Sequence, residues 1–554
     1  MKLFKRAATF CMAAAMALSL SVTAFAAGNG GDRTLTVTGD TLDNKKVFAV
    51  QMFDARVEGT GDNYTFDSYV LADEDWLTFF TTDTGSGGVG LTDQDSDGDV
   101  DTDDARAYVE SLQDQNLADF ANKAQAWVRS HSSNFTVLEV TASNDSATFA
   151  ELKAGYYLVY PEGGSTGNDS RGTDAMLVNV PRDNNAEWHI KSVFPTVDKK
   201  VDTDNEGAGD PADNGSAQVG DVVTFTLTSA VPDMSDYDTF YFAFNDTLSN
   251  GLKVVNNAGQ DVEDGTGITL DSLTVTIGGK SVTNGYTVNL SSNSLEIEFT
   301  DLKTATIQDG TITTGAAIVV TYKAMITEAA TTTNPANNEV KVEYSNDPSN
   351  TTHGTSTPDE TDVYTYEIKV NKWATDAGGQ TGNLAGAKFI LSTSATAPTA
   401  DEIADDYVSY TGIIKLIGSG NAYRVAKPGE EGAVTSFTTT ATGDITISGL
   451  EGSTDPGTTY YLHEIEAPAG YNKLKDPVAI VIIITDLSTG TATITVNGNT
   501  ATGDGNTTVD VENKKGIELP ETGSIGTIGL TVAGVAVVLA GVMLPRKKKN
   551  KEQE

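Results

Sequence analysis

The chain has 554 residues and is strongly acidic, with a formal net charge of −41 at pH 7. Such a surface repels nucleic acid and anionic membranes, and no basic patch opposes it, so nucleic acid is excluded as a partner. The only cysteine is Cys11, and the four histidines form no close cluster at zinc spacing. The length is too great for one ordinary domain and suits three or four.

Residues 1–26 have the pattern of a secretory signal peptide. Lys2, Lys5 and Arg6 precede an apolar stretch, and Ala24-Phe25-Ala26 supplies an A-x-A cleavage site. Cleavage after Ala26 would remove Cys11, so the exported protein would have no disulfide, the usual covalent staple outside the cell. The mature chain must fold without a covalent cross-link or use one other than a disulfide.

Alternating apolar and polar residues predict a mainly β protein. Short stretches such as Leu35–Val37, Val222–Leu227 and Ile445–Ile447 recur between turns rich in Gly, Asn, Asp and Ser. Abundant Thr and Val with little Pro are typical of β-sandwiches. One region differs, because apolar residues between Ala105 and Val128 recur at helical spacing. We therefore expect one or two helices inserted in the first domain.

Two segments indicate domain boundaries. Trp188–Lys200 leads from one β region into the next through Pro195. Asp347–Asp362 is rich in Asn, Ser, Thr and Pro and is expected to be a linker. The predicted divisions are an N-terminal domain at 27–190, a middle domain at 191–350 and a C-terminal domain at 360–516.

An acidic stretch at residues 93–104 fits a calcium-binding EF-hand loop at most positions. Carboxylates occupy positions 1, 3 and 5, Gly98 is at position 6, and a helical pattern follows. Position 12 holds Asp instead of Glu, no clear helix precedes the loop, and acidic turns are common in so acidic a chain. The predicted Ca²⁺ ligands are Asp93, Asp95, Asp97, Asp99 and Asp104. No other cofactor is expected.

The middle domain places a lysine on an apolar strand face. Val197, Lys199 and Val201 alternate onto one side of the first strand, where an unpaired ammonium is costly. Asp246 ends an aromatic, alternating strand, and Asn338 begins the strand expected to close the domain.

The C-terminal domain repeats this scheme. Ile368, Val370 and Lys372 alternate on its first strand, and Asn513 ends its last strand. Glu464 lies between them, in the segment Tyr460-Tyr461-Leu462-His463-Glu464.

These segments resemble the Cna protein B-type domains of Gram-positive pilins and wall-anchored adhesins. Tyr460-x-Leu462-x-Glu464 followed by Ala467-Pro468-Ala469-Gly470-Tyr471 resembles the pilin E-box. Leu384–Phe389 resembles the early-strand signature of the family, and Asp246–Leu248 followed by Gly251-Leu252 resembles part of the middle pilin domain. The resemblance implies tandem immunoglobulin-like β-sandwiches.

The resemblance also implies a Lys–Asn isopeptide bond in each of the two later domains. By position, these are Lys199 with Asn338, assisted by Asp246, and Lys372 with Asn513, assisted by Glu464. Lys200 and Asn337 adjoin the middle-domain pair. Strand alternation favours Lys199, and the Asn-x-Val spacing of the family favours Asn338. Burial favours a neutral amine and a protonated acid, and folding supplies proximity. Each reaction happens once, and no motif of an extracellular enzyme is found, so the chain is not expected to be an enzyme.

The C-terminus combines three elements. Leu519-Pro520-Glu521-Thr522-Gly523 precedes an uncharged run at 525–544, and Arg546–Lys549 follow. The run is long enough, as a helix, to span a bilayer core of about 30 Å. Residues 519–554 resemble the LPXTG sorting signal of Gram-positive surface proteins, in which a sortase cuts after the threonine, here Thr522, and joins it to an amine.

In pilins of this family the receiving amine is a lysine near the end of the first domain, in a motif close to W-x-x-x-V-x-V-Y-P-K. Trp188 and Val193-Phe194-Pro195 echo that motif, but Thr196 stands where the motif has lysine. Lys191 is the best substitute, and Lys200 is the second choice.

The sequence therefore leads to the hypothesis of a shaft subunit of a sortase-assembled pilus, anchored in the cell wall of a Gram-positive bacterium. The implied partners are identical subunits joined head to tail, pilus and housekeeping sortases, accessory pilins, peptidoglycan and host-surface ligands. A monomeric, wall-anchored adhesin of the same domains is the alternative.

Overall fold

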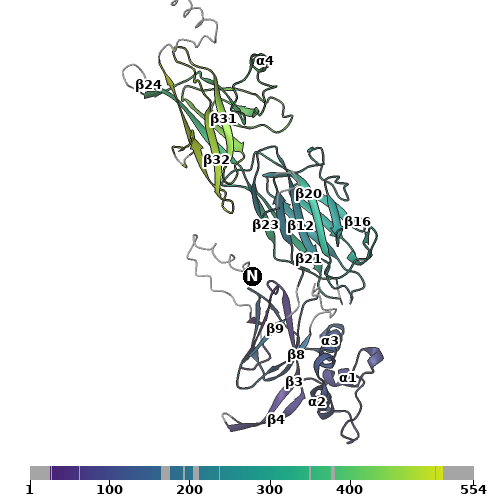
Figure 1. Cartoon of the computed structure of the whole chain (residues 1–554). Coiled ribbons are helices and arrows are strands. Elements are labelled where there is room, and N and C mark those ends of the chain that lie inside the picture. The colour runs from purple at the N-terminus through teal and green to yellow at the C-terminus, as the bar shows by residue number, and fades with distance from the viewer. Residues whose placement is uncertain are drawn as a thin grey trace, which may run out of the picture. The chain divides into compact units, whose positions relative to one another are not determined.

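The computed structural model shows a mainly β chain, which confirms the predicted fold class (Figure 1). It describes residues 25–26, 28–60, 63–163, 175–190, 194–203, 211–235, 237–348, 351–375, 381–503, 505 and 507–515. The chain separates into two compact units. The first holds residues up to Tyr366 together with Gly449–Gly452 and Ile484–Thr491, and the second holds the remainder.

The N-terminal part of the first unit contains two sheets. One has the order β1-β6-β2-β9, and the other has the order β4-β3-β7-β8, with β5 paired to β3. The strands are β1 (Phe25–Ala26), β2 (Arg33–Gly39), β3 (Lys46–Thr60), β4 (Asn63–Leu71), β5 (Leu138–Thr141), β6 (Ser146–Leu152), β7 (Gly155–Pro161), β8 (Met176–Val180) and β9 (Ala186–Ile190).

Strand β7 is buried on both faces, which explains how this part is layered. Tyr157 and Val159 belong to the core between the two sheets, whereas Leu158 and Tyr160 belong to a second core that includes helical residues. Because successive strand residues point to opposite faces, one strand serves both cores. Its nearly continuous apolar sequence follows from this arrangement.

Three helices pack against the sheet to form the second core, and they lie together in Figure 1. They are α1 (Glu74–Thr81), α2 (Thr102–Ser111) and α3 (Asp114–Ser130), with the 3₁₀ turns η1 (Thr84–Ser86) and η2 (Ser132–Asn134). Helices α2 and α3 confirm the predicted helical insertion. Helix α1 was not predicted, because its eight residues are too few for a clear helical period. Trp76, Phe79 and Phe80 nevertheless bury one face of it.

The middle part of the first unit is a sandwich of two seven-stranded sheets. One runs β10-β12-β20-β15-β16-β19 with β14 paired to β20, and the other runs β11-β23-β21-β13-β18-β17 with β22 paired to β21. The strands are β10 (Asp198–Asp202), β11 (Asn214–Ser216), β12 (Val222–Ala230), β13 (Phe242–Leu248), β14 (Leu252–Val254), β15 (Thr274–Ile277), β16 (Lys280–Asn284), β17 (Thr287–Ser291), β18 (Ser294–Phe299), β19 (Thr306–Ile307), β20 (Ala317–Ile326), β21 (Ala336–Ser345), β22 (His353–Thr355) and β23 (Asp359–Tyr364). The 3₁₀ turn η3 (Leu302–Thr304) precedes β19.

The expected linker at Asp347–Asp362 is wrong for the parts of that segment that form strands. Strands β22 and β23 lie in or overlap it, and both pair antiparallel with β21. Its polar composition misled the prediction, because two of the three buried residues of β23, Val363 and Tyr364, lie beyond the segment and only Thr361 lies within it. The assignment of domain boundaries at 190, 350 and 360 stays a prediction.

The second sandwich, in the C-terminal part, also has two sheets. One runs β25-β24-β30-β28-β27 with β35 paired to β24, and the other runs β29-β26-β31-β32-β33-β34. The elements are β24 (Tyr366–Thr375), β25 (Thr381–Asn383), β26 (Lys388–Ser392), α4 (Ala400–Ala404), β27 (Leu416–Ser419), β28 (Ala422–Val425), β29 (Phe437–Thr438), β30 (Asp444–Leu450), β31 (Thr458–Glu466), β32 (Val478–Asp486), β33 (Thr491–Val496), β34 (Asn499–Thr500) and β35 (Thr508–Lys514).

The two predicted processing signals fall largely outside the residues that the structure describes. The predicted signal peptide has only Phe25–Ala26 within the described residues, and the predicted membrane segment at 525–544 has none. Among the residues that are described, no helix is both long and apolar enough to cross a bilayer.

Candidate cross-linking sites and an acidic loop

In the C-terminal sandwich, the three predicted residues form one buried cluster. Lys372 and Asn513 are fully buried, and Glu464 is 4% exposed. The Lys372 amine donates a hydrogen bond to Asn513 Oδ1 at 2.5 Å, and Asn513 Nδ2 donates to Glu464 Oε1 at 2.8 Å. The amine therefore touches one end of the carboxamide and the acid touches the other end.

Strand pairing creates this approach. Lys372 lies on β24 and Asn513 lies on β35, and the two strands pair in parallel with Lys372 opposite Val511 and Ala374 opposite Asn513. The predicted alternation is confirmed, because Ile368, Val370 and Lys372 all lie buried on β24. The backbone beside Lys372 is crowded, since a Cβ on Gly443 (φ +72°) would lie only 2.4 Å from the Lys372 carbonyl oxygen. Glycine is therefore required at that turn.

Burial shifts the Lys372 amine toward its neutral form. Desolvation lowers the pKa of Lys372 from 10.5 to about 8, although the carboxylates of Glu464 and Glu512 act in the opposite direction. Glu464 is itself held in place, because its Oε2 accepts a hydrogen bond from the Leu474 backbone N–H at 2.7 Å. A sizeable neutral fraction of the amine thus faces a positioned acid near neutral pH.

The middle sandwich brings its three predicted residues into a second buried cluster, joined by a tyrosine. Lys199, Asp246 and Asn338 are fully buried. Lys199 Nζ lies 2.5 Å from Asp246 Oδ1. The Tyr322 hydroxyl donates to Asp246 Oδ2 at 2.6 Å and accepts from Asn338 Nδ2 at 2.6 Å. Desolvation lowers the pKa of Lys199, against the opposing charge of Asp246.

This second cluster spans both sheets of its sandwich. Lys199 on β10 and Tyr322 on β20 belong to one sheet, whereas Asp246 on β13 and Asn338 on β21 belong to the other. The predicted alternation is confirmed, since Val197, directly before β10, and Lys199 and Val201 on β10 are all buried. Sequence reasoning missed Tyr322. The available signal was its place on the apolar face of β20, where a buried tyrosine hydroxyl needs a partner.

The neighbouring candidates Lys200 and Asn337 lie outside this cluster. Lys200 pairs with Asp198 and Asp213. Partial burial lowers the pKa of Lys200, but hydrogen bonds to these two carboxylates raise it more, so the net shift is upward. The Asn337 carboxamide donates to Glu360 and Asp362. The structure thus places Lys199 and Asn338 in the buried cluster, where Asp246 and Tyr322 connect them, and leaves Lys200 and Asn337 outside it.

A third buried lysine, Lys45, has different neighbours. Its amine donates to the Thr355 carbonyl and lies 4.9 Å from the centre of the Tyr344 ring. The nearby Asn346 carboxamide donates to Glu162 and accepts from the Thr352 hydroxyl. Burial lowers the pKa of Lys45 to about 8, against the charge of Glu162. The Lys45 amine donates to a backbone carbonyl, whereas the amine at each site above donates to a carboxamide or to an acid, so this cluster does not repeat their geometry.

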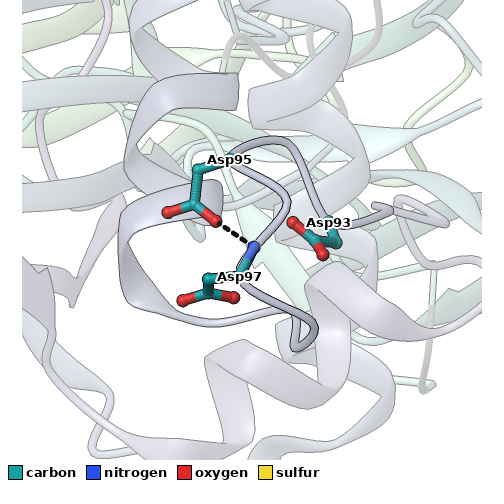
Figure 2. Close-up of side chains that lie close together, drawn as sticks. All are labelled: Asp93, Asp95 and Asp97. Carbon is teal, nitrogen blue, oxygen red and sulfur yellow. Dashed lines mark hydrogen bonds between the residues drawn. The ribbon is translucent and has the colours of Figure 1, made fainter.

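The acidic loop gathers three of its five predicted calcium ligands. Carboxylate oxygens of Asp93, Asp95 and Asp97 lie within 4.8 Å of one another. Figure 2 shows these three side chains close together on the loop. Asp93 folds the loop by accepting backbone hydrogen bonds from Ser96 and Gly98.

The negative charges in this loop repel one another, and this repulsion affects the pKa of Asp95. A hydrogen bond from the Asp97 backbone lowers the pKa of Asp95, but desolvation and the adjacent carboxylates raise it, so that the net shift is upward.

The other two predicted ligands do not join this group. Asp104 is 2% exposed, and its two carboxylate oxygens accept the backbone N–H groups of Gln94 and Asp101. Asp104 therefore completes a capping box with Asp101 at the start of α2. Asp99 lies on the loop but is not among the three clustered carboxylates. Helix α1 precedes the loop, separated from it by η1 and a short connection.

The residues of the sorting signal and the first-choice acceptor lysine lie outside the described residues. Leu519, Pro520, Glu521, Thr522 and Gly523 lie beyond the described residues, and so does Lys191, the first residue after β9.

Family comparisons identify two segments of the chain. Residues 511–554 match the family described as the LPXTG cell wall anchor motif. Residues 366–500 match SpaA, a prealbumin-like fold domain. The anchor motif assigns the protein to the cell wall surface of a Gram-positive bacterium. The prealbumin-like match includes Lys372 and Glu464, whereas Asn513 and its strand β35 lie beyond the matched residues.

Solved structures similar to this chain include major pilins. The full-length major pilin SpaD from Corynebacterium diphtheriae is 19% identical, with a TM-score of 0.39, over 87% of this chain and 97% of that chain. The major pilin SpaA from the same organism is 15% identical, with a TM-score of 0.42, over 87% and 100%. BcpA from Bacillus cereus is 15% identical, with a TM-score of 0.37, over 88% and 99%. No curated protein matches the sequence.

Proposed function

We propose that this protein is the structural shaft subunit of a covalently polymerised surface pilus that supports adhesion and colonisation. A sortase would join Thr522 of one subunit to Lys191 of the next, and intradomain Lys–Asn isopeptide bonds would reinforce each subunit. The observation that carries the proposal is the buried cluster of Lys372, Asn513 and Glu464. It lies in a chain whose C-terminus is a cell wall anchor. Such a protein is structural, and its only chemistry would be self-modification.

The isopeptide reaction follows from the positions of the three groups. The Lys372 ammonium gives a proton to Glu464, and the neutral amine attacks Cγ of Asn513. Glu464, in contact with Asn513 Nδ2, then protonates the departing nitrogen. The Cγ–Nδ2 bond breaks and ammonia leaves. The surplus proton on the new amide nitrogen passes to Glu464, and a neutral Nζ–Cγ amide remains. The fold supplies the proximity that makes an ordinarily slow amide exchange feasible.

The two bonds would reinforce their sandwiches in different ways. Lys372–Asn513 would join the adjacent strands β24 and β35, which are the first and last strands of the C-terminal sandwich. Tension applied at its two ends would then pass through one covalent path. Lys199–Asn338 would instead tie β10 in one sheet to β21 in the other, so it would resist separation of the two sheets.

The proposal predicts a covalent polymer. Subunits joined head to tail form an open, heterologous assembly. Wall extracts boiled in SDS should therefore give a ladder of bands on a gel, with each step equal to one subunit. A single monomer-sized band from wild-type cells that express the cognate sortases would contradict the shaft role and favour the monomeric adhesin.

We also propose that the loop at 93–104 binds Ca²⁺ through Asp93, Asp95 and Asp97, with Asp99 and Asp104 as further candidate ligands. The proximity of the three carboxylates supports it, because their mutual repulsion is relieved by a hard cation that prefers oxygen ligands. Bound Ca²⁺ would stiffen the connection between α1 and α2.

Calorimetric titration of the mature chain tests the calcium proposal. Extracellular calcium modules have dissociation constants of about 0.1–1 mM, and a value near that range is expected. The double variant Asp95→Asn/Asp97→Asn should lose the binding heat. Asp32→Asn, which removes an exposed charge outside the loop, should retain it. Absence of binding heat and of thermal stabilisation at millimolar Ca²⁺ in the unmodified chain would contradict the site.

A further inference from the structure

The two cross-linking clusters differ in how the acid reaches the carboxamide. In the C-terminal sandwich, Glu464 accepts directly from Asn513 Nδ2 at 2.8 Å. In the middle sandwich, the Tyr322 hydroxyl lies between Asp246 and Asn338, with a distance of 2.6 Å on each side. Aspartate is one methylene shorter than glutamate, and the tyrosine oxygen fills the resulting gap.

The Asn338 carboxamide is hydrogen-bonded at its nitrogen but, among the described residues, not at its oxygen. Within the described part of the chain, its buried Oδ1 has no hydrogen-bond partner, and its Nδ2 donates to Tyr322. Asp246 is at the same time in contact with the Lys199 amine at 2.5 Å. A proton that leaves Lys199 therefore has a continuous path through Asp246 and Tyr322 to the nitrogen that must depart.

We infer that Tyr322 is a catalytic proton relay for the Lys199–Asn338 cross-link, an inference that rests on the isopeptide chemistry proposed above. Asp246 takes a proton from the Lys199 ammonium, and the neutral amine attacks Cγ of Asn338. Tyr322 gives its hydroxyl proton to Nδ2 and receives the proton held by Asp246, so it ends unchanged. The Cγ–Nδ2 bond breaks and ammonia leaves. The surplus proton on the new amide nitrogen passes to Asp246.

The environment of Tyr322 suits a relay. Tyr322 is fully buried in the sandwich core, and its ring stacks on Phe225 at a centroid distance of 5.5 Å, which fixes the hydroxyl. Burial and the adjacent Asp246 raise the pKa of Tyr322 well above its ordinary value, so the hydroxyl keeps its proton until both neighbours exchange protons with it. A hydroxyl can donate and accept at once, which a carboxylate alone cannot do.

Tyr322→Phe tests the relay, because it removes one oxygen and retains the ring. The mature chain is made by cell-free synthesis, and intact mass with peptide mapping follows each cross-link over time. General acid–base groups contribute about 10²–10⁴-fold, so the Lys199–Asn338 bond should form at least about 100-fold more slowly in this variant. The Lys372–Asn513 bond should form at the wild-type rate and serves as an internal control. Tyr286→Phe, in the same sandwich but outside the cluster, should leave both rates unchanged.

A rescue variant separates catalysis from packing. In Tyr322→Phe/Asp246→Glu, the longer acid reaches Asn338 as Glu464 reaches Asn513, and it should restore much of the lost rate. Wild-type kinetics in Tyr322→Phe would overturn the relay, and so would failure of the longer acid to accelerate the slow variant. Absence of the Lys199–Asn338 bond in the wild-type chain would instead refute the underlying cross-link, a result distinct from either.

Discussion

Replacing Glu464 with glutamine is expected to leave Lys372 and Asn513 unjoined, with a large loss of stability. Glutamine keeps the size of the side chain but cannot take the lysine proton or return it to the leaving nitrogen. The variant should retain one ammonia, about 17 Da, that the wild-type chain loses. The two residues are 141 positions apart, and a link closing a loop of that order contributes about 5 kcal/mol on the chain-entropy model.

Mass spectrometry measures the retained ammonia, and urea unfolding of the C-terminal sandwich measures the loss of stability. Glu466→Gln is the matched control, because Glu466 is an exposed residue at the end of the same strand. It should cross-link fully and unfold as the wild type does. Asp246→Ala should produce the corresponding defect in the middle sandwich alone. A Glu464→Gln chain with the wild-type ammonia loss would remove Glu464 from the reaction.

Replacing Lys191 with alanine is expected to abolish the SDS-resistant ladder while monomers remain at normal abundance. The variant lacks the proposed acceptor amine, so a sortase that has cut after Thr522 has no subunit to which it can join that residue. Thr522→Ala should abolish the ladder from the donor side. Immunoblots of wall extracts, boiled in SDS, measure both results.

Lys200→Ala is the control for the acceptor assignment. Lys200 is partly buried between Asp198 and Asp213, and its pKa is raised by hydrogen bonds to them despite partial burial, so its amine is held as a charged, paired group. Its removal should leave the ladder intact. A ladder that survives Lys191→Ala and disappears in Lys200→Ala would assign the acceptor to Lys200.

Much of the fold and of both clusters could be predicted because strand alternation is a local property. A lysine that shares a strand face with alternating Val or Ile residues is expected to be buried, and Lys199 and Lys372 are both fully buried. The resemblance to Cna B-type domains supplied the partners, and the structure places Asn513 and Glu464 in contact. The helical period likewise identified α2 and α3.

The features that were missed depend on contacts between distant segments. Tyr322 is one of several apolar or aromatic residues on β20, and only the pairing of sheets brings its hydroxyl between Asp246 and Asn338. Strand β23 has a polar sequence, and its place beside β21 is set by antiparallel backbone pairing with that strand and not by its own composition. The capping role of Asp104 was also missed, because its carboxylate accepts backbone N–H groups of Gln94 and Asp101, which are brought to it by the folding of the loop. Its part in calcium binding stays a prediction.

The intact mass of the chain from residue 27 to residue 516 tests the central claim most directly. Two intradomain isopeptide bonds require the loss of two molecules of ammonia, about 34 Da below the mass calculated from the sequence. Peptide mapping should recover Lys199 joined to Asn338 and Lys372 joined to Asn513. A mass equal to the calculated value, from a folded chain, would contradict the account.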